Sequence, residues 1–290
     1  MTPNYGYNKK KYLQRGSMYP IVEKKVLSAN VKLLKIKAPL VAKKALPGQF
    51  IILRINEKGE RIPLTIADSD SKKGTVSIIF LEVGKTTKQL GLLNVGDTLE
   101  NFAGPLGMPS EVKKYGTVVC VGGGVGIAPL YPIVKALKEA GNRVISILGA
   151  KTADLLLLEK EIHALSDEFY IATDDGSKGH KGFVSDVLQQ VIDKHKVDMV
   201  MAIGPIIMMK VVSNLTKKYN IKTLVSLNPI MVDGTGMCGG CRVMIDGKTK
   251  FACVDGPEFD GHKVDYDNLM LRNRRFVHAE GEACTLAGVK

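Results

Sequence analysis

From residue 117 to residue 227, apolar strand-like runs alternate with helical patterns. The apolar runs lie at residues 117–122, 143–149, 168–174, 197–204 and 221–227, and the helical patterns lie between them at residues 128–141, 152–166, 183–195 and 205–219. Five strands that alternate with four helices predict a doubly wound α/β domain with a parallel sheet. Ligands of such sheets bind at the carboxyl ends of the strands, so the residues that follow each run are candidate binding residues.

A glycine-rich loop follows the first of these runs, in the segment VCVGGGVGIAPL at residues 119–130. Glycines allow a tight turn and bring backbone N–H groups close to a pyrophosphate at a helix N-terminus, where negative charge is favoured. A tight turn with no ligand is the alternative. Because the loop stands between a strand and a helix at the head of the alternation, we expect a dinucleotide site. The candidate residues are Gly122, Gly123, Gly124, Val125 and Gly126.

Two later strands end in segments that would lie on the same edge of the sheet, ATDDGS at residues 172–177 and AIGPIIMM at residues 202–209. Carboxylates could accept hydrogen bonds from a ribose, and a Gly-Pro pair permits close approach of a flat ring. Ordinary turn and helix-start chemistry is the alternative for both segments. The candidate nucleotide-binding residues here are Thr173, Asp174, Asp175, Gly204, Pro205 and Met208.

The N-terminal part of the chain predicts a different architecture. Short runs rich in Val, Ile and Leu lie at residues 18–27, 30–38, 49–55, 61–68 and 74–83, separated by turn-forming residues. This spacing predicts a small antiparallel barrel over residues 18–112, with a short helix from Thr86. Residues 1–44 hold eleven Lys and Arg and one acid, so +10 of the net charge of +12 lies there. We interpret residues 1–17 as a solvated basic arm, although a tail for nucleic acid or membranes is the alternative.

Three cysteines gather near the C-terminus. Cys238 and Cys241 are two residues apart, Cys253 follows after eleven more, and Asp233 precedes Cys238 by five positions. Plant-type two-iron clusters use C-x4-C-x2-C with a distant fourth cysteine, so this block reads as that pattern with a carboxylate in the first position. A carboxylate is also a monoanionic ligand. Three thiolates and an acid could equally bind zinc, and Asp233 could be only a turn residue.

The remaining cysteines and the apolar runs suggest neither a disulfide-rich nor a membrane-spanning chain. Cys120 lies in a buried strand pattern and Cys284 in the tail, and we interpret both as non-ligands. The uncharged stretch at residues 117–134 contains four glycines and two prolines, which does not suit a helix that faces lipid. The first residues lack the apolar stretch of a signal peptide, so we expect a cytoplasmic protein.

A barrel, a nucleotide sheet and a C-terminal cysteine block, in that order, resemble the ferredoxin-NADP reductase-like flavoproteins, and within them the electron-transfer subunits related to the small partner of dihydroorotate dehydrogenase. The most specific mark is Asp233, because one subgroup of these subunits has aspartate where the dihydroorotate-type relatives have cysteine. The resemblance implies an arm at residues 1–17, an FAD-binding barrel at 18–112, an NAD(P)-binding α/β domain at 113–227, and a [2Fe-2S]-binding region at 228–290.

The resemblance also implies where FAD binds. RIPLTIAD matches the flavin strand, which puts Pro63, Leu64 and Thr65 beside the isoalloxazine ring and the ribityl chain. VGKTTKQL matches the segment that binds the FAD phosphates at a helix start, with Gly84, Lys85, Thr86 and Thr87 as the binding residues. Relatives often have arginine directly before this proline, whereas here Ile62 holds that place. Arg61, the candidate residue for binding the flavin phosphates, stands one residue earlier, and strand alternation points it to the other face.

The implied activity is an electron relay. NADH would give a hydride to FAD, and single electrons would pass through a [2Fe-2S] cluster ligated by Asp233, Cys238, Cys241 and Cys253, with no catalytic side-chain acid or base. In this family the subunit forms a heterodimer with a larger flavin and iron–sulfur subunit, through which ferredoxin and NADP(H) react by electron bifurcation. The sequence does not distinguish NADH from NADPH as the substrate, and Lys151 keeps NADPH open.

Two other functions are weighed against the relay. The first is a dihydroorotate dehydrogenase electron-transfer subunit, against which Asp233 argues. The second is a zinc-stabilised nucleic-acid-binding protein that would use the basic N-terminus. Residues 228–258 are not markedly basic and hold no arginines interleaved with aromatic residues, so we expect neither a nucleic-acid nor a membrane partner.

Overall fold

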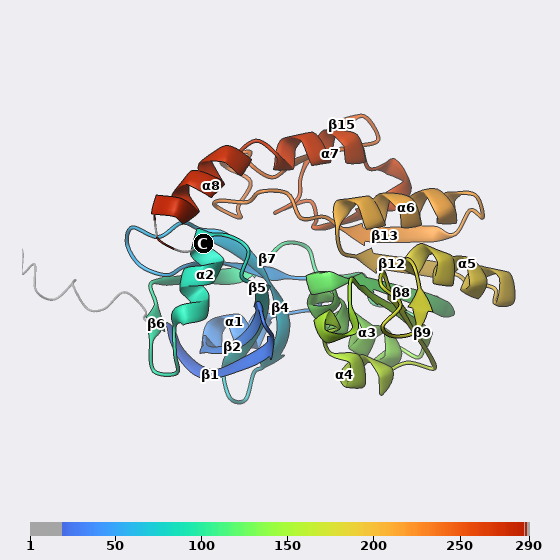
Figure 1. Ribbon diagram of the computed structural model, residues 1–290, viewed down its shortest axis with the longest axis horizontal. Coiled ribbons are helices and arrows are strands. Elements are labelled where there is room, and N and C mark those ends of the chain that lie inside the picture. The colour runs from blue at the N-terminus through green and yellow to red at the C-terminus, as the bar shows by residue number, and fades with distance from the viewer. Residues whose placement is uncertain (1–18, 287, 289–290) are drawn as a thin grey trace, which may run out of the picture.

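A computed structural model describes residues 19–286 and 288 of the chain, so the expected basic arm at residues 1–17 lies outside the described residues. Two seven-stranded sheets stand side by side, and a C-terminal block of one hairpin and two helices runs across them (Figure 1). Within the described part of the chain, no helix has the length and apolar character needed to cross a bilayer.

The first sheet is the expected antiparallel barrel. Its strand order is β6-β1-β2-β5-β4-β3-β7, and every neighbouring pair is antiparallel. The strands are β1 (Tyr19–Ser28), β2 (Val31–Lys37), β3 (Phe50–Arg54), β4 (Ile62–Asp70), β5 (Thr75–Leu81), β6 (Thr98–Leu99) and β7 (Asn101–Leu106). Only Glu100 separates the two edge strands, and its N–H donates to the carbonyls of Arg54 and Ile55. The sheet therefore curls until its two edges nearly meet.

Two helices accompany the barrel, α1 (Pro39–Lys44) and α2 (Lys85–Leu92). The expected helix near Thr86 is therefore present. The amine of Lys24 on β1 holds the C-terminal end of α2, donating to the carbonyls of Gly91 at 2.8 Å and Leu93 at 2.7 Å. A lysine at this end also suits the negative pole of the helix dipole.

The second sheet confirms the predicted doubly wound domain. Its order is β11-β10-β9-β8-β12-β13-β16, and the only antiparallel pair among these described strands joins β13 to β16. The strands are β8 (Thr117–Gly123), β9 (Arg143–Ala150), β10 (Glu168–Thr173), β11 (His180–Lys181), β12 (Met199–Ile203), β13 (Lys222–Ser226) and β16 (Glu258–Asp260). The strand order reverses between β8 and β12, which is where doubly wound sheets bind ligands.

Three of the four expected helices are present, as α3 (Ile127–Glu139), α5 (Val184–Lys194) and α6 (Ile206–Lys217). The expectation of one continuous helix over residues 152–166 is wrong. That segment forms a 3-10 turn at Ala153–Leu155 and a short helix α4 (Glu159–His163). Leu156, Leu157 and Leu158 all pack against the core next to α3. Consecutive helical residues point about 100° apart, so the backbone leaves the helix, and Leu158 adopts a φ of 51°.

The C-terminal block consists of the hairpin β14 (Arg242–Ile245) and β15 (Lys248–Phe251), followed by α7 (Tyr266–Asn273) and α8 (Val277–Leu286). In Figure 1, α7 lies above α6, and α8 extends from there to a position above α2. Among the described elements, α7 packs against both α6 and β14, and α8 touches α2.

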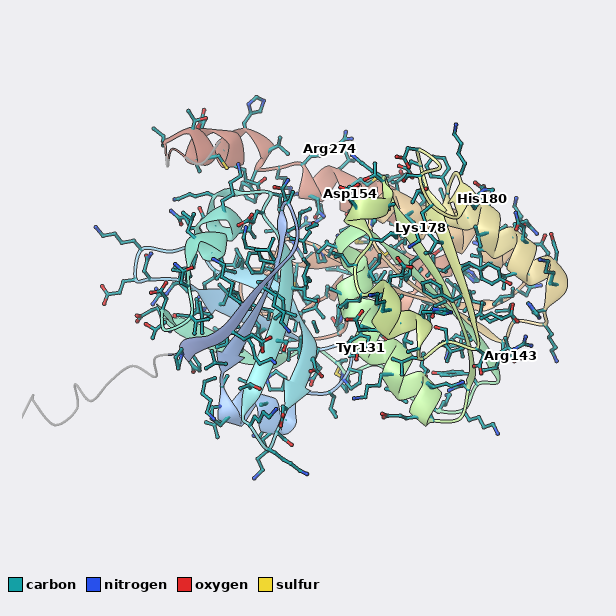
Figure 2. The ribbon with its side chains drawn as sticks, turned by 60° about the horizontal axis from the view of Figure 1, so that its bottom comes forward. Tyr131, Arg143, Asp154, Lys178, His180 and Arg274 are labelled. Carbon is teal, nitrogen blue, oxygen red and sulfur yellow. The ribbon has the colours of Figure 1, made fainter. Side chains whose placement is uncertain are left out.

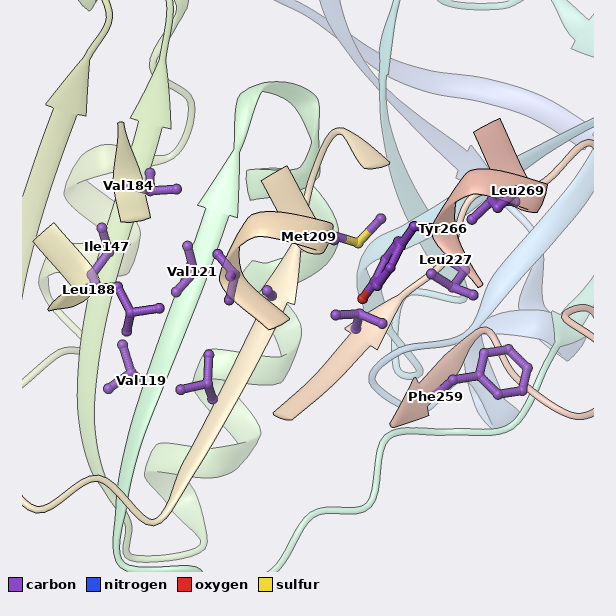
Figure 3. Packing of buried hydrophobic residues seen from close by; sticks show 14 of the residues in the cluster. Val119, Val121, Ile147, Val184, Leu188, Met209, Leu227, Phe259, Tyr266 and Leu269 are labelled. Carbon is purple, nitrogen blue, oxygen red and sulfur yellow. The ribbon is translucent and has the colours of Figure 1, made fainter. Parts of the chain in front are cut away.

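One core joins the sheet to the C-terminal block. Tyr266 and Leu269 of α7 pack beside Met209 of α6, with Leu227 and Phe259 close by (Figure 3). Each fully buried apolar side chain of this size contributes about 1.5–3 kcal/mol to stability. The Tyr266 hydroxyl also shares a hydrogen bond of 2.7 Å with the Ser213 hydroxyl inside this core. The C-terminal block is therefore held firmly on the nucleotide sheet.

Candidate functional site

Cys241 and Cys253 form one close pair in the cysteine block. Their sulfur atoms are 3.1 Å apart, both side chains are buried, and both thiols are free. Burial and then the hydrogen bond from Cys241 raise the pKa of the Cys253 thiol above its ordinary value. The two chain segments meet because the Ala252 N–H donates to the Cys241 carbonyl at 3.1 Å, which continues the β14–β15 hairpin pairing.

Asp233 and Cys238 form a second pair at the exposed end of the block. The Cys238 N–H donates to Asp233 Oδ2 at 2.8 Å, and the Thr235 N–H donates to Oδ1 at 3.0 Å. The Thr235 N–H, followed by the N–H and thiol of Cys238, lowers the pKa of the Asp233 carboxyl. The charge of Asp233 also acts on Cys253, so the two pairs lie near each other.

The two pairs fit a two-iron centre better than a single ion. No group of three or more His, Cys, Asp or Glu side chains among the described residues is close enough to hold one metal ion. In two-iron clusters, each iron takes two protein ligands. Three thiols and one carboxylate, gathered as two pairs, have the right donor atoms and grouping for such a cluster.

The loop that carries these ligands lies on the wall of the barrel. Gly234 has a φ of 76°, and a Cβ atom there would lie 2.7 Å from Leu106 Cδ1 and 2.9 Å from Ile52 Cγ1. Only glycine combines this backbone conformation with so close an approach. Ile52 on β3 pairs with Pro63 on β4, so the loop packs on the barrel face that carries Pro63. The candidate cluster ligands are thereby brought next to the expected flavin strand.

The structure divides the expected flavin-strand residues between two faces. Pro63 and Thr65 pair with Ile52 and Phe50, whose side chains belong to the core shared with the cysteine block. Leu64 and Ile62 instead pack against the barrel core. Pro63 and Thr65 therefore face the cysteine block and Leu64 faces the barrel interior. Arg61 is exposed and lies just before the strand.

The start of α2 is suited to anions. Gly84 is the N-cap, where no side-chain atom is found within 4 Å of the position a Cβ would take, and the Thr87 hydroxyl accepts the N–H groups of Gly84 and Val83. The Thr86 hydroxyl donates to the Glu60 carboxylate, and the Lys85 amine lies 4.0 Å from the same group. Sequence reasoning missed Glu60. Thr86 and Lys85, which are expected at the FAD phosphates, both contact its carboxylate, so these two side chains can hold an anionic oxygen group.

The glycine loop lies at the point where the strand order reverses. It continues from β8 through the 3-10 turn Gly124–Gly126 into α3, whose N-terminus has no side-chain cap. Gly124 has a φ of 55° and open space where a Cβ would be. A Cβ on Gly126 would lie 2.5 Å from the Ile203 carbonyl, so this glycine lets α3 pack on the end of β12. Open N–H groups at a helix start fit a pyrophosphate.

Met208 explains two of the other glycines in this region. Cβ atoms on Gly123 and Gly204 would lie 2.4 Å from Met208 Sδ and 2.7 Å from Met208 Cε. The room left by these glycines is therefore filled by the methionine side chain. Met208 is half-buried, and Val125 and Pro205 are exposed beside it, whereas Gly122 packs against Leu130 and Ile127.

The polar side chains of the loop after β10 mainly form hydrogen bonds within the loop itself. The Thr173 hydroxyl is buried and bonds both the N–H and the carbonyl of Lys178. Asp175 accepts hydrogen bonds from the N–H and hydroxyl of Ser177, and these bonds lower the pKa of its carboxyl. Asp174 is exposed, so its carboxylate is available to a ligand. In Figure 2, Lys178 and His180 mark this loop at the outer part of the sheet.

Arg272 is a second residue that sequence reasoning missed, although the segment LRNRRF contains three arginines that could have drawn attention. It lies in the last turn of α7, and its Nη2 donates to the Gly240 carbonyl at 3.3 Å. Its Nε is buried with no hydrogen-bond partner. Burial, together with the charges of Arg275 and Arg242, lowers the pKa of Arg272, while the nearby Cys241 acts in the opposite direction.

Sequence-family models match three consecutive parts of the chain. Residues 18–110 match the oxidoreductase FAD-binding domain, and residues 120–214 match the oxidoreductase NAD-binding domain. Residues 228–265 match the iron–sulfur cluster binding domain of dihydroorotate dehydrogenase B. The chain therefore carries FAD-, NAD- and iron–sulfur-binding domains, as the sequence predicts, and the zinc alternative has no support.

Several known proteins are similar over most of the chain. A Thermotoga maritima protein described as a dihydroorotate dehydrogenase B (NAD(+)), electron transfer subunit homolog is 50% identical over 260 residues, which are 90% of this chain and 92% of that protein. The dihydroorotate dehydrogenase B (NAD(+)), electron transfer subunit of Desulforamulus reducens is 34% identical over 250 residues, covering 83% of this chain and 95% of that subunit.

Solved structures agree with these relatives. One chain from a structure of NADH-dependent reduced ferredoxin-NADP oxidoreductase, described in connection with flavin-based electron bifurcation, superposes with a TM-score of 0.88. It is 45% identical, and the match covers 95% of this chain and 98% of that one. The cytochrome b5 reductase domain of Ulva prolifera nitrate reductase, at 20% identity and a TM-score of 0.57, covers 72% of this chain and 94% of that domain and shares the fold alone.

Proposed function

Because this chain belongs to the family of dihydroorotate dehydrogenase B electron-transfer subunits and their homologues, within the ferredoxin-NADP reductase-like flavoproteins, we propose that it is the small subunit of an NADH-dependent ferredoxin:NADP oxidoreductase. In this role it exchanges electrons with NAD(H) and passes them to a larger flavin and iron–sulfur subunit. The observation that carries the proposal is the packing of the Asp233–Cys238 and Cys241–Cys253 pairs on the barrel face that carries Pro63.

The four paired side chains are the proposed cluster ligands. Cys241 and Cys253 would hold the buried iron and Asp233 and Cys238 the outer one. Both thiols of the buried pair must lose their protons on binding metal, and burial makes the loss from Cys253 costly until the metal compensates it. The Asp233 carboxyl is held in its ionised form by backbone N–H groups, so it is ready to act as a ligand.

The remaining proposed sites follow the sheet edge and the barrel. Pro63 and Thr65 would line the flavin ring, with Lys85, Thr86 and the start of α2 at its phosphates. When bound, FAD supplies the conversion between two-electron exchange with NADH and one-electron exchange with the cluster. The glycine loop before α3 would hold the dinucleotide pyrophosphate, and Asp174 a ribose. None of these residues needs to act as an acid or base; they orient the reactants.

The alternative partner is a dihydroorotate dehydrogenase. Two observations favour the oxidoreductase. In the subgroup that the sequence resembles, the first ligand position is an aspartate, as at Asp233. The chain is also 45% identical to a chain of the oxidoreductase structure and 34% identical to the Desulforamulus reducens subunit, while the Thermotoga maritima protein at 50% is described only as a homolog of that subunit. NADH-dependent reduction measured with each candidate large subunit distinguishes the two. Coupling to NADP⁺ and ferredoxin supports the proposal, and coupling only to dihydroorotate formation refutes it.

The relay itself is tested on the chain purified without air. We expect FAD and two irons per chain, with an EPR signal after reduction by NADH. Cys238→Ser should lose iron while FAD remains, and Cys284→Ser is the matched control, because both thiols are accessible but only the first lies beside Asp233. Equal iron in both variants would remove Cys238 from the ligand set.

A further inference from the structure

The last turn of α7 lies against the loop that carries the proposed cluster ligands. Arg272 Nη2 donates to the Gly240 carbonyl, which directly precedes Cys241, and the Asn273 side chain donates to the Asn228 carbonyl at 3.1 Å. The two contacts hold the beginning and the end of the same loop. Because Gly240 is the residue before a proposed ligand, the hydrogen bond from Arg272 links α7 to the backbone next to Cys241.

The position of this turn is set by the rest of the helix. The Asp265 carboxylate caps α7 by accepting the Asn268 N–H at 2.9 Å, and the Lys210 amine on α6 pairs with Asp267 at 2.7 Å. Leu269 is 1% exposed and packs in the shared core. The backbone at Arg272 is therefore held in place by α7, which is anchored by its cap, its ion pair and its core contacts.

Arg272 also has a hydrogen-bond donor without an acceptor. Its Nε is buried with no partner, and a buried N–H without an acceptor is destabilising. The side chain interacts electrostatically with Cys241 and is surrounded by like charges from Arg242 and Arg275. Three guanidinium groups close together on one face repel one another, so an anionic group on that face would relieve both the repulsion and the unpaired donor.

We propose that Arg272 is a positioning residue of the iron–sulfur site, and that its guanidinium favours the extra negative charge which the site carries after it accepts one electron. The proposal depends on the proposed cluster ligands. No bond forms or breaks and no proton moves; one electron enters the site, and a fixed cation beside Cys241 makes that state more stable. Charge and hydrogen bonds around cluster sulfurs are known determinants of cluster potential.

The test is an EPR-monitored redox titration of the full chain, purified with FAD and iron. Arg272→Gln should lower the ratio of reduced to oxidised cluster at a fixed potential about tenfold, which corresponds to a midpoint about 59 mV more negative for a one-electron couple. Arg272→Lys keeps the charge but not the planar donors and should shift the midpoint in the same direction by less. Arg274→Gln is the matched control, because this exposed arginine directly follows α7 (Figure 2).

The outcomes separate the inference from the proposed function. A wild-type chain without iron would refute the proposed function. A wild-type chain with iron and an unchanged midpoint in Arg272→Gln would refute only the inference. If Arg272→Gln retains less iron, the EPR titration still reports the midpoint of the chains that keep a cluster, and a value equal to that of the wild type overturns the proposal. A shift of equal size in Arg274→Gln would show that distant surface charge is responsible, and would also overturn it.

Discussion

Glu258 is a buried carboxyl at the junction of the three parts of the molecule, and its ionisation should set a pH dependence of stability. It lies on β16 opposite Ser226 of β13, and it accepts a hydrogen bond from the Ser110 hydroxyl at the end of the barrel. A Cβ on Gly48 would lie 2.9 Å from its Oε1, so the barrel loop covers it closely. Burial raises the pKa of Glu258 to about 7, although the Ser110 hydrogen bond acts in the opposite direction.

The sign follows from proton linkage. Between pH 4.5 and 7 the folded chain keeps the Glu258 proton, whereas the unfolded chain has lost it. The contribution of Glu258 to stability is therefore fully present below pH 4.5, falls as the pH rises through this window, and is absent above pH 7. A shift from 4.5 to about 7 corresponds to about 3 kcal/mol, since each unit of pKa is worth about 1.4 kcal/mol.

Glu258→Gln should remove this penalty, because a neutral amide keeps an acceptor for Ser110 and needs no charge in the interior. In urea titrations followed by circular dichroism, the variant should be more stable than the wild type by up to about 3 kcal/mol at pH 8, and equal to it at pH 4.5. Glu57→Gln, at an exposed position, serves as the control and should show no such difference. A gap between Glu258→Gln and wild type that is the same at both pH values would refute the reasoning.

Three other changes test separate parts of the structure. Gly234→Ala should lower iron content and cost about 1–3 kcal/mol in unfolding free energy, whereas Gly247→Ala, with a similar φ of 70° but open space around it, should keep its iron. Lys24→Met should release FAD several-fold more readily, measured by ultrafiltration, with iron unchanged, because it frees the end of α2. Burial lowers the pKa of His262, so the folded chain favours its neutral form. The stability that this form gives is present above about pH 6.5 and lost below it. Urea titrations of His262→Gln should show less of this loss on acidification.

The sequence predicted the parts of the fold that repeat a regular pattern. The five parallel strands were found because each is a continuous apolar run, and β8 and β12, with both faces covered, are the clearest cases. The expected helix at residues 152–166 failed because the chain buries three adjacent leucines, Leu156, Leu157 and Leu158, by leaving helical geometry. Short pieces such as β6 have too few residues to show any period.

The proposed ligands could be found from the sequence because their spacing reflects a local loop. Asp233 and Cys238 meet through bonds within six residues, and the hairpin brings Cys253 back to Cys241. The spacing does not indicate which parts of the barrel and of α7 this loop packs against. Contacts between Gly234 and Ile52, or Arg272 and Gly240, join positions that are far apart along the chain, and no motif within one segment encodes them.

Similar long-range contacts join the nucleotide sheet and the cysteine block to the barrel. An electron path between two cofactors needs a fixed separation, and loops alone do not provide it. Here β16 adds to the nucleotide sheet beside β13, the cis peptide Gly256–Pro257 leads into it directly after the last proposed ligand segment, and the Met108 N–H on the barrel side donates to the Gly256 carbonyl at 2.7 Å. Barrel, sheet and ligand segment therefore meet at one strand end, where the backbone hydrogen bonds from Met108 to Gly256 and from Leu227 to Pro257 join them.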